Sequence, residues 1–449
     1  MMCSSNRRSF LRRGALISSA VTLGFPHIAL SKDQIKLRVA VIGLGQRSEY
    51  AFRSLHREQI TALCDVDTRT FDQVVDKRRM QHTPVELWPL AKRFEDYREL
   101  FEYPQLFDAV WIATPDHHHF PAAIRAIKAG KAVYCEKPLA WSVIECQQLA
   151  DAARNYEVAT QMGNQGMANM GWRMGRTYYE KGLLGDILEV HTYTGTRFDR
   201  PLERYLGSDP VPSGLNWDLW LGPAPARPYL ESVYHPFEWR GVRDFGNGAL
   251  GDWSCHLMNG FYKILEPDYP SSVECLEKRE YADRTYAAGY TLRYEYPSKK
   301  GRPSFSSYWY NGACAPPRPK ALEVGRNLGG IGSYLVGTKG TLWLKGGYVE
   351  SPILLPETFR RKIGRIECAV PRSNHVEEFI QAAKGVTAYD ATLSHFGYSG
   401  PMTAGALFGN IATYFDGKLE YDPVTRRFTN IEVANKWLQR KNPRAGWYV

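Results

Sequence analysis

Apolar residues between about residue 36 and residue 163 gather in short runs, and longer segments with helical spacing separate them. Runs that match buried β-strands in length and composition lie at 37–42, 60–64, 107–113, 131–135 and 159–163. Helical spacing follows at 142–155 and at 122–129, which Pro121 opens and Gly130 ends. This alternation predicts an α/β fold in which a doubly wound parallel sheet carries helices on its faces.

The pattern changes in the second half of the chain, where β-rich runs such as 187–193 and 333–337 appear. The segment 337–340 joins two apolar runs as the turn of a hairpin does. A glycine-rich stretch at 245–251 leads into a helix that carries Asp252 and His256 four positions apart. Residues with this spacing lie on one face of a helix.

The first apolar run ends in the turn Gly43-Leu44-Gly45-Gln46-Arg47, and a helical segment follows it. Glycine permits the sharp strand-to-helix turn and lets backbone amides approach a pyrophosphate. The third glycine of the G-x-G-x-x-G pattern is replaced here by Ser48. The second run ends in Asp65, at the position where a carboxylate bonds the ribose hydroxyls of a dinucleotide. Together these features predict a dinucleotide-binding site.

The charge of Asp65 favours NAD, because a carboxylate repels the 2′-phosphate of NADP. Arg47 and Arg69 would offset that repulsion, so NADP stays open as an alternative.

The amino-acid composition excludes some classes of function for this protein. The 449 residues are 44% hydrophobic and 23% charged, which suits globular domains, two rather than one. The net charge is +10, but basic clusters such as 77–79 and 360–362 lack the interleaved aromatic residues of a nucleic-acid groove, so no nucleic-acid partner is predicted. The eight cysteines form no C-x-x-C pair, which argues against a structural zinc site and a dense disulfide framework.

The N-terminus carries Arg7-Arg8 ahead of Ser9-Phe10-Leu11, and a modestly apolar stretch follows at 14–30. The arrangement resembles a twin-arginine (Tat) export signal, and the apolar stretch is too short and too polar for a stable membrane span. We therefore expect export to the periplasm or cell envelope. The alternative is a basic tail followed by an ordinary helix.

Three motifs in order, GLGQR at 43–47, ATPDHHH at 113–119 and CEKPLA at 135–140, resemble the Gfo/Idh/MocA family of oxidoreductases, and the Asp252–His256 spacing matches that family's D-x-x-x-H signature. The resemblance implies a Rossmann domain at 36–160 after the signal segment 1–31. It also implies a second α/β domain at 161–449, with a large, mostly antiparallel open sheet and a C-terminal segment that packs back on the first domain. A homo-oligomer is expected, because family members commonly associate through the open sheet.

The resemblance implies the chemistry as well. Lys137 and His256 are the candidates for the proton acceptor, Asp252 would orient His256 or the substrate, and Glu136 and Pro138 would shape the turn that presents Lys137. The predicted cofactor residues are Gly43, Gly45, Gln46, Arg47, Asp65, Thr114, Pro115, His119, Glu136, Lys137 and Gln165. The predicted substrate residues are Lys137, Tyr234, His235, Arg240, Asp244, Asp252 and His256, although aromatic residues among polar neighbours describe core packing equally well.

The run His117-His118-His119 suggests a metal site, but consecutive residues cannot all face one ion, so no metal is predicted. By motif position, His119 supports the nucleotide site, and the other two histidines are turn residues.

The predicted activity is hydride transfer between a nicotinamide and a sugar, sugar derivative or cyclitol. Because free NAD is scarce outside the cytoplasm, we expect a tightly held cofactor that is reduced and reoxidised in one cycle. Two alternatives remain open. One is a redox-neutral, NAD-dependent glycoside hydrolase, and the other is a cofactor-bound sugar-binding protein without turnover.

Overall fold

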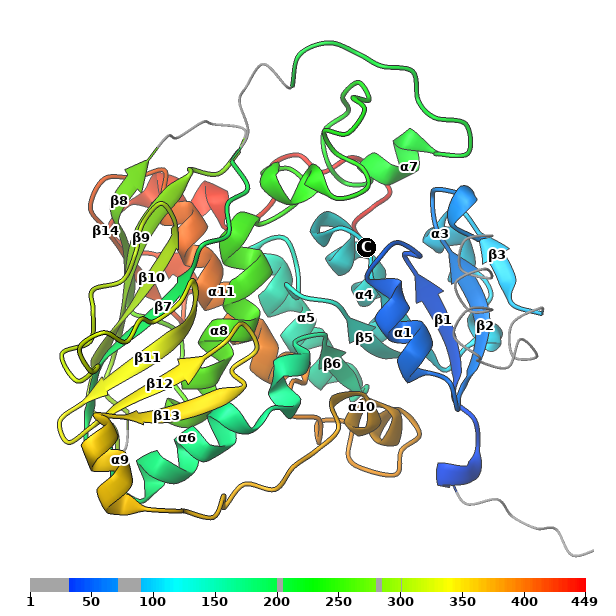
Figure 1. Cartoon of the computed structure of the whole chain (residues 1–449). Coiled ribbons are helices and arrows are strands. Elements are labelled where there is room, and N and C mark those ends of the chain that lie inside the picture. The colour runs from blue at the N-terminus through cyan, green and yellow to red at the C-terminus, as the bar shows by residue number, and fades with distance from the viewer. Residues whose placement is uncertain (1–31, 72–89, 200–204, 280–284, 300) are drawn as a thin grey trace, which may run out of the picture.

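The computed structural model describes residues 32–71, 90–199, 205–279, 285–299 and 301–449. Their strands form two sheets, and Figure 1 shows these sheets at opposite sides of the molecule with helices between them. The segment 1–31, to which we assign the export signal, lies outside the described residues.

The first sheet has six parallel strands in the order β3-β2-β1-β4-β5-β6. Their bounds are β1 Arg38–Ile42, β2 Gln59–Cys64, β3 Lys92–Phe94, β4 Ala109–Ile112, β5 Ala132–Cys135 and β6 Thr160–Met162. The helices of this half are α1 Ser48–Ser54, α3 Tyr97–Leu100, α4 His119–Lys128 and α5 Val143–Tyr156. The predicted doubly wound parallel sheet is confirmed.

Two local signals set the helix ends of this half. Ser142 accepts a hydrogen bond from the backbone of Glu145, and the Glu145 side chain accepts one from Ser142, so a complete capping box begins α5. Gly130, at φ +67°, follows the end of α4.

The second sheet has nine strands in the order β13-β12-β11-β7-β10-β9-β8-β14-β15. Of the described strand pairs in this second sheet, only β7–β10 is parallel, which confirms the expected, mostly antiparallel sheet. The bounds are β7 Ile187–Thr194, β8 Ser272–Arg279, β9 Gly289–Tyr296, β10 Phe305–Gly312, β11 Ile331–Gly337, β12 Thr341–Lys345, β13 Ser351–Leu355, β14 Lys418–Asp422 and β15 Arg427–Phe428. The expected hairpin at 337–340 joins β11 to β12.

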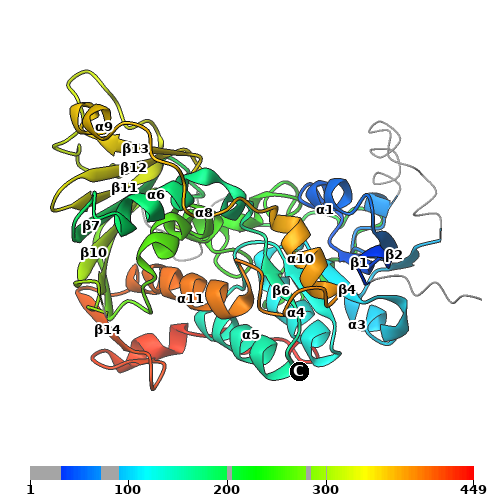
Figure 2. The same cartoon turned by 90° about the horizontal axis from the view of Figure 1, so that it is seen from below.

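The helices of the second half are α6 Met170–Glu180, α7 Trp217–Leu221, α8 Gly248–Leu265, α9 Glu357–Ile363, α10 His375–Ala383 and α11 Phe396–Ala412. Helices α8 and α11 lie between the two sheets, and Figure 2 shows α11 beside α5. Nearly every residue of α8 is buried, so this helix fixes its polar residues rigidly in the core of the molecule.

Residues 205–247, which we call the cap, lie over the carboxyl end of the parallel sheet and contain α7 (Figure 1). The cap has its own aromatic core, which includes Trp220, Tyr234 and Phe245. Two backbone hydrogen bonds, from Thr68 to Gly214 and from Asn216 to Val66, join the cap to the chain that follows β2.

The C-terminal segment packs against the parallel sheet half. Arg125 of α4 donates hydrogen bonds to the carbonyls of Gly446 and Trp447, and the Trp447 ring contacts Tyr97 and His118. The end of the chain therefore lies against the parallel sheet half, and the division of the chain into domains stays a prediction.

Candidate active site

A cleft lies where the carboxyl ends of β1, β2, β4 and β5 meet the cap and α8. Because parallel strands present these ends at one edge of a sheet, the residues that follow them converge there. Of the predicted site residues, the cleft brings together Gly43, Gly45, Gln46, Arg47, Asp65, Thr114, Pro115, Glu136, Lys137, His235, Arg240, Asp252 and His256. His119, Gln165, Tyr234 and Asp244 lie outside its lining.

The two glycines of the turn after β1 have different surroundings. Gly43 has φ +87°, and a Cβ added there would lie 2.7 Å from the carbonyl carbon of Ala113. A Cβ added to Gly45 would meet no atom within 4 Å, because this position faces the open cleft. Gly43 therefore allows the close approach of β1 and β4, and Gly45 leaves room for a ligand.

Asp65 lines the cleft beside the glycine turn. Its two carboxylate oxygens accept hydrogen bonds from the amides of Leu44 (2.6 Å) and Asp67 (2.8 Å). Burial raises the pKa of Asp65 to about 6, although these amides favour the charged form. The hydrogen bond from Leu44 thus holds the Asp65 carboxylate against the glycine turn.

The two arginines that would favour a 2′-phosphate are both engaged. Arg69 forms two hydrogen bonds of 2.7 Å with the carboxylate of Asp67. Nε of Arg47 lies 2.8 Å from Oε2 of the buried Glu136, and the Arg47 side chain also donates to Gln165. Gln165 thus lies behind Arg47, which lines the cleft.

Lys137 and Asp252 meet at the centre of the cleft. Nζ of Lys137 lies 2.5 Å from Oδ1 of Asp252 and 3.0 Å from its backbone carbonyl oxygen, and Nε of Arg240 lies 3.6 Å from the same Oδ1. Burial would raise the pKa of Asp252, but these two cations outweigh burial and lower it. The Lys137–Pro138 peptide bond is cis.

His256 lies one helical turn after Asp252 on α8, and the residue is 3% exposed. The Tyr348 ring packs edge-on against the imidazole with centroids 4.7 Å apart. Burial first, and the nearby Lys137 charge second, lower the pKa of His256 well below its usual value. The imidazole is therefore neutral at pH 7, and its Nδ1 has no hydrogen-bond partner in the described part of the chain.

Asp116 is a cleft residue that the sequence analysis did not single out. Its Oδ2 accepts hydrogen bonds from the backbone amide (3.0 Å) and the side chain (3.4 Å) of Asn247, the residue that precedes α8. Burial raises the pKa of Asp116 to about 7. A signal was available, because Asp116 stands directly after the Thr114-Pro115 pair at the carboxyl end of β4.

The histidine run is a buried packing element. Nε2 of His117 and of His118 each lie 2.9 Å from the carbonyl oxygen of Trp220, which joins the parallel sheet to the cap. The ring nitrogens of His119 lie 2.6 Å from the Pro138 carbonyl oxygen and 3.0 Å from the Thr114 carbonyl oxygen. His119 therefore connects the motif at 113–119 to the motif at 135–140 without lining the cleft. Burial lowers the pKa of all three histidines.

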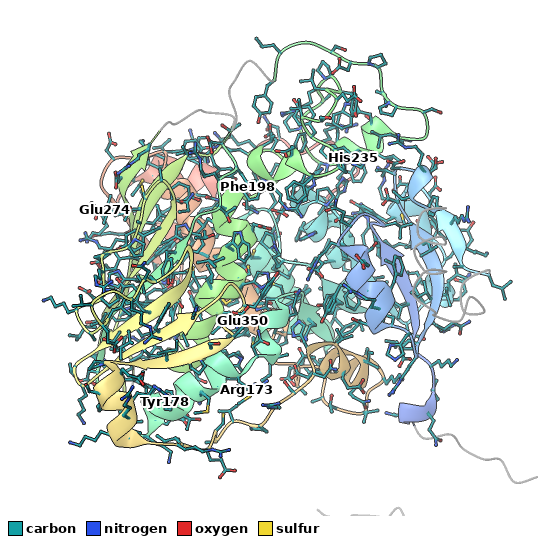
Figure 3. The ribbon with its side chains drawn as sticks, in the orientation of Figure 1. Arg173, Tyr178, Phe198, His235, Glu274 and Glu350 are labelled. Carbon is teal, nitrogen blue, oxygen red and sulfur yellow. The ribbon has the colours of Figure 1, made fainter. Side chains whose placement is uncertain are left out.

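Two predicted substrate residues lie elsewhere. Tyr234 is 3% exposed and packs against Trp217 and Phe245 within the cap, and Asp244 pairs with Arg227 and lines a second cavity. His235 does reach the cleft, where its Nε2 lies 3.1 Å from Oδ2 of Asp67; the residue is labelled in the cap at the top of Figure 3. Besides Asp116, the cleft residues that were missed include a mainly aromatic group, Tyr97, His118, Phe237, Trp239 and Tyr348.

Within the described ranges, no group of three or more His, Cys, Asp or Glu side chains is arranged to hold a metal ion. In the same part of the chain, none of the helices combines the length and the apolar character needed to cross a membrane.

Comparison with known proteins identifies two matching sequence profiles. Residues 37–164 match the Gfo/Idh/MocA profile described as an oxidoreductase family with an NAD-binding Rossmann fold, and residues 173–300 match the profile of that family's C-terminal alpha/beta domain. A glycosyl hydrolase family 109 protein of Shewanella pealeana is 31% identical over 159 residues, 34% of each chain. Inositol 2-dehydrogenase of Salmonella typhimurium is 26% identical over 160 residues, 34% of this chain and 45% of that protein. These alignments span less than half of the length of either relative.

Solved structures share the fold at low identity. The WlbA dehydrogenase from Bordetella pertussis, in complex with NADH and UDP-GlcNAcA, has a TM-score of 0.59 at 16% identity, over 86% of this chain and 99% of that chain. Aldose-aldose oxidoreductase from Caulobacter crescentus, complexed with glycerol, has a TM-score of 0.54 at 15% identity, over 86% and 100% of the two chains.

Proposed function

Because the chain belongs to the Gfo/Idh/MocA family of oxidoreductases, we propose that it oxidises a hydroxyl group of a sugar, sugar derivative or cyclitol with a nicotinamide held in the cleft. One observation carries the proposal. The glycine turn and Asp65 open into the same cleft as Lys137, Asp252 and His256. Related proteins support the substrate class, since they include an inositol dehydrogenase and glycosyl hydrolases of family 109.

The residues present fit NAD. The cleft encloses about 1210 Å³, counting the open space at its mouth, and Gly45 leaves its wall free of side-chain atoms. Asp65 would bond the ribose hydroxyls, and Arg47 and Arg69 are each committed to an acid of the protein. This pairing favours NAD over NADP, because neither guanidinium is left for a 2′-phosphate. A nicotinamide bound there supplies the hydride acceptor of the reaction.

The chain's own residues supply the proton chemistry. His256 lines the cleft and is neutral, so it accepts the proton of the substrate hydroxyl. Lys137 donates a hydrogen bond to the same oxygen, and Asp252 holds the Lys137 ammonium in position. Buried Asp116 supplies a further carboxyl group at the edge of the site.

The test is to purify the protein without added nucleotide, denature it and identify the released cofactor by mass spectrometry. Near-stoichiometric NAD(H), followed by a change in its absorbance at 340 nm on mixing with a panel of sugars and cyclitols, supports the proposal. A protein that binds the cofactor but reduces none of it with any substrate favours the sugar-binding alternative.

We further propose that the cofactor stays bound through the catalytic cycle. The cap supports this idea, because its contacts close over the chain that follows β2. The isolated bridge between Asp67 and Leu215 and the His235–Asp67 hydrogen bond both lie next to Asp65. A dinucleotide would leave this end of the cleft only when these contacts open.

A redox-neutral glycoside hydrolase is the second candidate, and Asp116 is the observation that favours it. In that reaction transient oxidation at C3 acidifies the C2 proton, the aglycone leaves from C1 by elimination, water adds, and the hydride returns to C3. Elimination and hydration need an acid–base group besides His256, and a carboxyl with a pKa of about 7 is suited to that work. Release of aglycone from nitrophenyl glycosides, without net reduction of the cofactor, distinguishes this activity from a dehydrogenase.

We also propose export through the twin-arginine pathway and a homo-oligomer in solution. Arg7-Arg8 supports the export proposal, and half-exposed Leu188 on β7 and Leu276 on β8 support association through the nine-stranded sheet. Fractionation of cells with and without an Arg7-Arg8→Lys-Lys change tests the first proposal. Light scattering of the purified protein tests the second.

A further inference from the structure

A loop of the nine-stranded sheet reaches the cleft. Residues 346–350 join β12 to β13, and Glu350 at the end of this loop is labelled near the centre of Figure 3. Tyr348 of the loop lines the cleft together with Lys137 and His256. The reaction proposed above gives Tyr348 no role.

The backbone of the loop is strained next to Tyr348. Val349 has a φ of +56°, in the left-handed region that β-branched residues rarely adopt, and its side chain is fully buried. A strained residue persists only where the surrounding structure holds it, and such residues gather at functional sites. The strain at Val349 therefore indicates a function for its neighbour in the cleft.

Two helices hold the loop in this conformation. A Cβ added to Gly171 of α6 would lie 2.0 Å from the carbonyl oxygen of Val349, and one added to Gly260 of α8 would lie 3.3 Å from a Val349 methyl carbon. The side chain of Asn169 donates a hydrogen bond of 2.8 Å to the carbonyl oxygen of Tyr348. The loop is thus fixed against α6 and α8 by the protein itself.

The fixed loop places an aromatic ring on His256. The Tyr348 ring meets the imidazole edge to face, with centroids 4.7 Å apart, and the Trp253 ring lies 6.0 Å from the same imidazole. The Tyr348 hydroxyl makes no hydrogen bond to a described residue, so the ring alone makes the contact with His256. Although His256 lines the cleft, the residue is only 3% exposed.

We propose that Tyr348 is a positioning residue of the reaction, whose ring keeps water away from His256 and so keeps the imidazole neutral. The proposal rests on the proposed function, in which His256 accepts the proton of the substrate hydroxyl. The physical reason is that an imidazolium loses more hydration energy on burial than a neutral imidazole does.

The charges around His256 show why the ring matters. Asp252 on the same helix favours the imidazolium, whereas the cations Lys137 and Arg47 oppose it. His375, at the start of α10, opposes it as well, although burial lowers the pKa of His375 itself to about 4. Burial is the largest cause of the low pKa of His256. Water at the imidazole would remove that cause and leave Asp252 to attract a proton.

The test is an NMR titration of His256 in the whole protein, labelled with ¹³C at histidine Cε1, with His256→Gln to identify the signal. We expect the wild-type signal to keep its neutral position from pH 8 to about pH 5.5. In Tyr348→Ala, water reaches the imidazole, and the midpoint should move toward about 6.5, the ordinary value for histidine. Tyr348→Phe keeps the ring and should match the wild type. Tyr348→Thr is a second truncation if Tyr348→Ala does not fold.

Tyr156→Ala is the control, because it removes a 49% exposed ring at the end of α5 and should leave the His256 signal unchanged. The proposal is overturned if His256 titrates alike in the wild type and in Tyr348→Ala. A shift of equal size in Tyr348→Phe, or a wild-type midpoint near 6.5, would overturn it as well.

A pH profile of kcat/KM separates this proposal from the proposed function. Between pH 8 and pH 6, kcat/KM of Tyr348→Ala should fall up to about 4-fold more than that of the wild type, since a base with a pKa of 6.5 is about one-quarter neutral at pH 6. An NMR shift without this fall would show that a group other than His256 accepts the proton. The assignment within the proposed function would then fail, while the shielding of His256 by Tyr348 would stand.

Discussion

The Lys137 ammonium contacts Asp252 twice, through the carboxylate at 2.5 Å and through the backbone carbonyl at 3.0 Å. The two residues come from the parallel sheet half and from α8, so this contact joins the cofactor half of the cleft to the substrate half. An ammonium group that is held by both the carboxylate and the backbone carbonyl of Asp252 has little freedom to move. Its hydrogen-bond geometry toward a substrate oxygen is consequently set before the substrate binds.

Replacing this cation should abolish turnover without emptying the cleft. Lys137→Met keeps most of the side-chain volume and removes the donor, and we expect kcat to fall about 10²–10⁴-fold, as for loss of a positioned proton-transfer group. The bound cofactor, measured by mass spectrometry after denaturation, should stay near the wild-type amount. Unchanged activity in Lys137→Met would show that the catalytic assignment is wrong.

The glycine turn offers a matched pair of substitutions. Gly43→Ala should lower the free energy of unfolding by about 2–4 kcal/mol, because the new Cβ meets the Ala113 backbone at a positive φ. Gly45→Ala should leave the melting temperature unchanged and weaken NAD binding, since its Cβ enters open space in the cleft. Thermal unfolding with and without NAD separates the two effects. Equal losses of stability in both variants would contradict the assigned roles.

Asp65 should make cofactor retention depend on pH. Its pKa of about 6 means that the carboxylate becomes protonated as the pH falls through 6, and it then accepts one hydrogen bond fewer. We expect the rate of NAD release to rise between pH 7 and pH 5. Asp65→Asn should release NAD faster than the wild type at pH 7 and lose this pH dependence. A wild-type rate that is flat over this range would rule out the role given to Asp65.

Asp116 should make stability depend on pH in the opposite sense to an ordinary ion-paired acid. Its pKa of about 7 in the folded state lies above the unfolded value, so the folded protein binds the extra proton. The stabilising contribution is complete below about pH 4 and is lost as the pH rises through 7. At one pKa unit per 1.4 kcal/mol, the loss is at most about 4 kcal/mol.

Asp116→Asn tests this sign directly. The variant cannot ionise, and its amide oxygen still accepts from Asn247. The unfolding free energy of the variant relative to the wild type should therefore increase from pH 4 to pH 8, as measured by urea denaturation. A difference that decreases over this range would mean that Asp116 is ionised in the folded protein.

The cap contacts should control how fast the cofactor leaves. His235→Ala removes the hydrogen bond to Asp67 but leaves the core of the cap intact, and we expect NAD release to accelerate at least several-fold. The control is His56→Ala, because His56 is exposed and its ring lies 3.0 Å from the Arg53 carbonyl at the end of its own helix. Stopped-flow trapping of released NAD gives both rates. Identical rates in the two variants would leave the cap without a role in retention.

The sequence predicts the cofactor half of the cleft well for a physical reason. Glycine turn, Asp65, Thr114 and Lys137 all follow parallel strands, and the carboxyl ends of those strands share one edge of the sheet. Strand order along the chain is then enough to bring these residues together. The α8 pair of Asp252 and His256 is equally predictable, because helical periodicity places both residues on one face.

The substrate half is less predictable because it depends on long-range packing. Tyr234 and His235 are adjacent in the chain, yet one packs inside the cap and the other reaches Asp67. Long-range packing likewise pairs Asp244 with Arg227, and no local sequence pattern predicts this ion pair. Asp116 was missed because no local pattern shows that its carboxyl group is buried in the cleft against Asn247.

The C-terminal segment sets an order of events during synthesis. Arg444 donates hydrogen bonds to the carbonyls of Asp218 and Gly222 in the cap, across 226 positions of the chain for the first of them. At about 5–20 residues per second, a ribosome needs roughly 10 to 45 s to deliver Arg444 after the cap has emerged. During that interval the cap lacks the hydrogen bonds that Arg444 donates to it. The cap therefore reaches its final contacts with the rest of the molecule only when synthesis of the chain is almost finished.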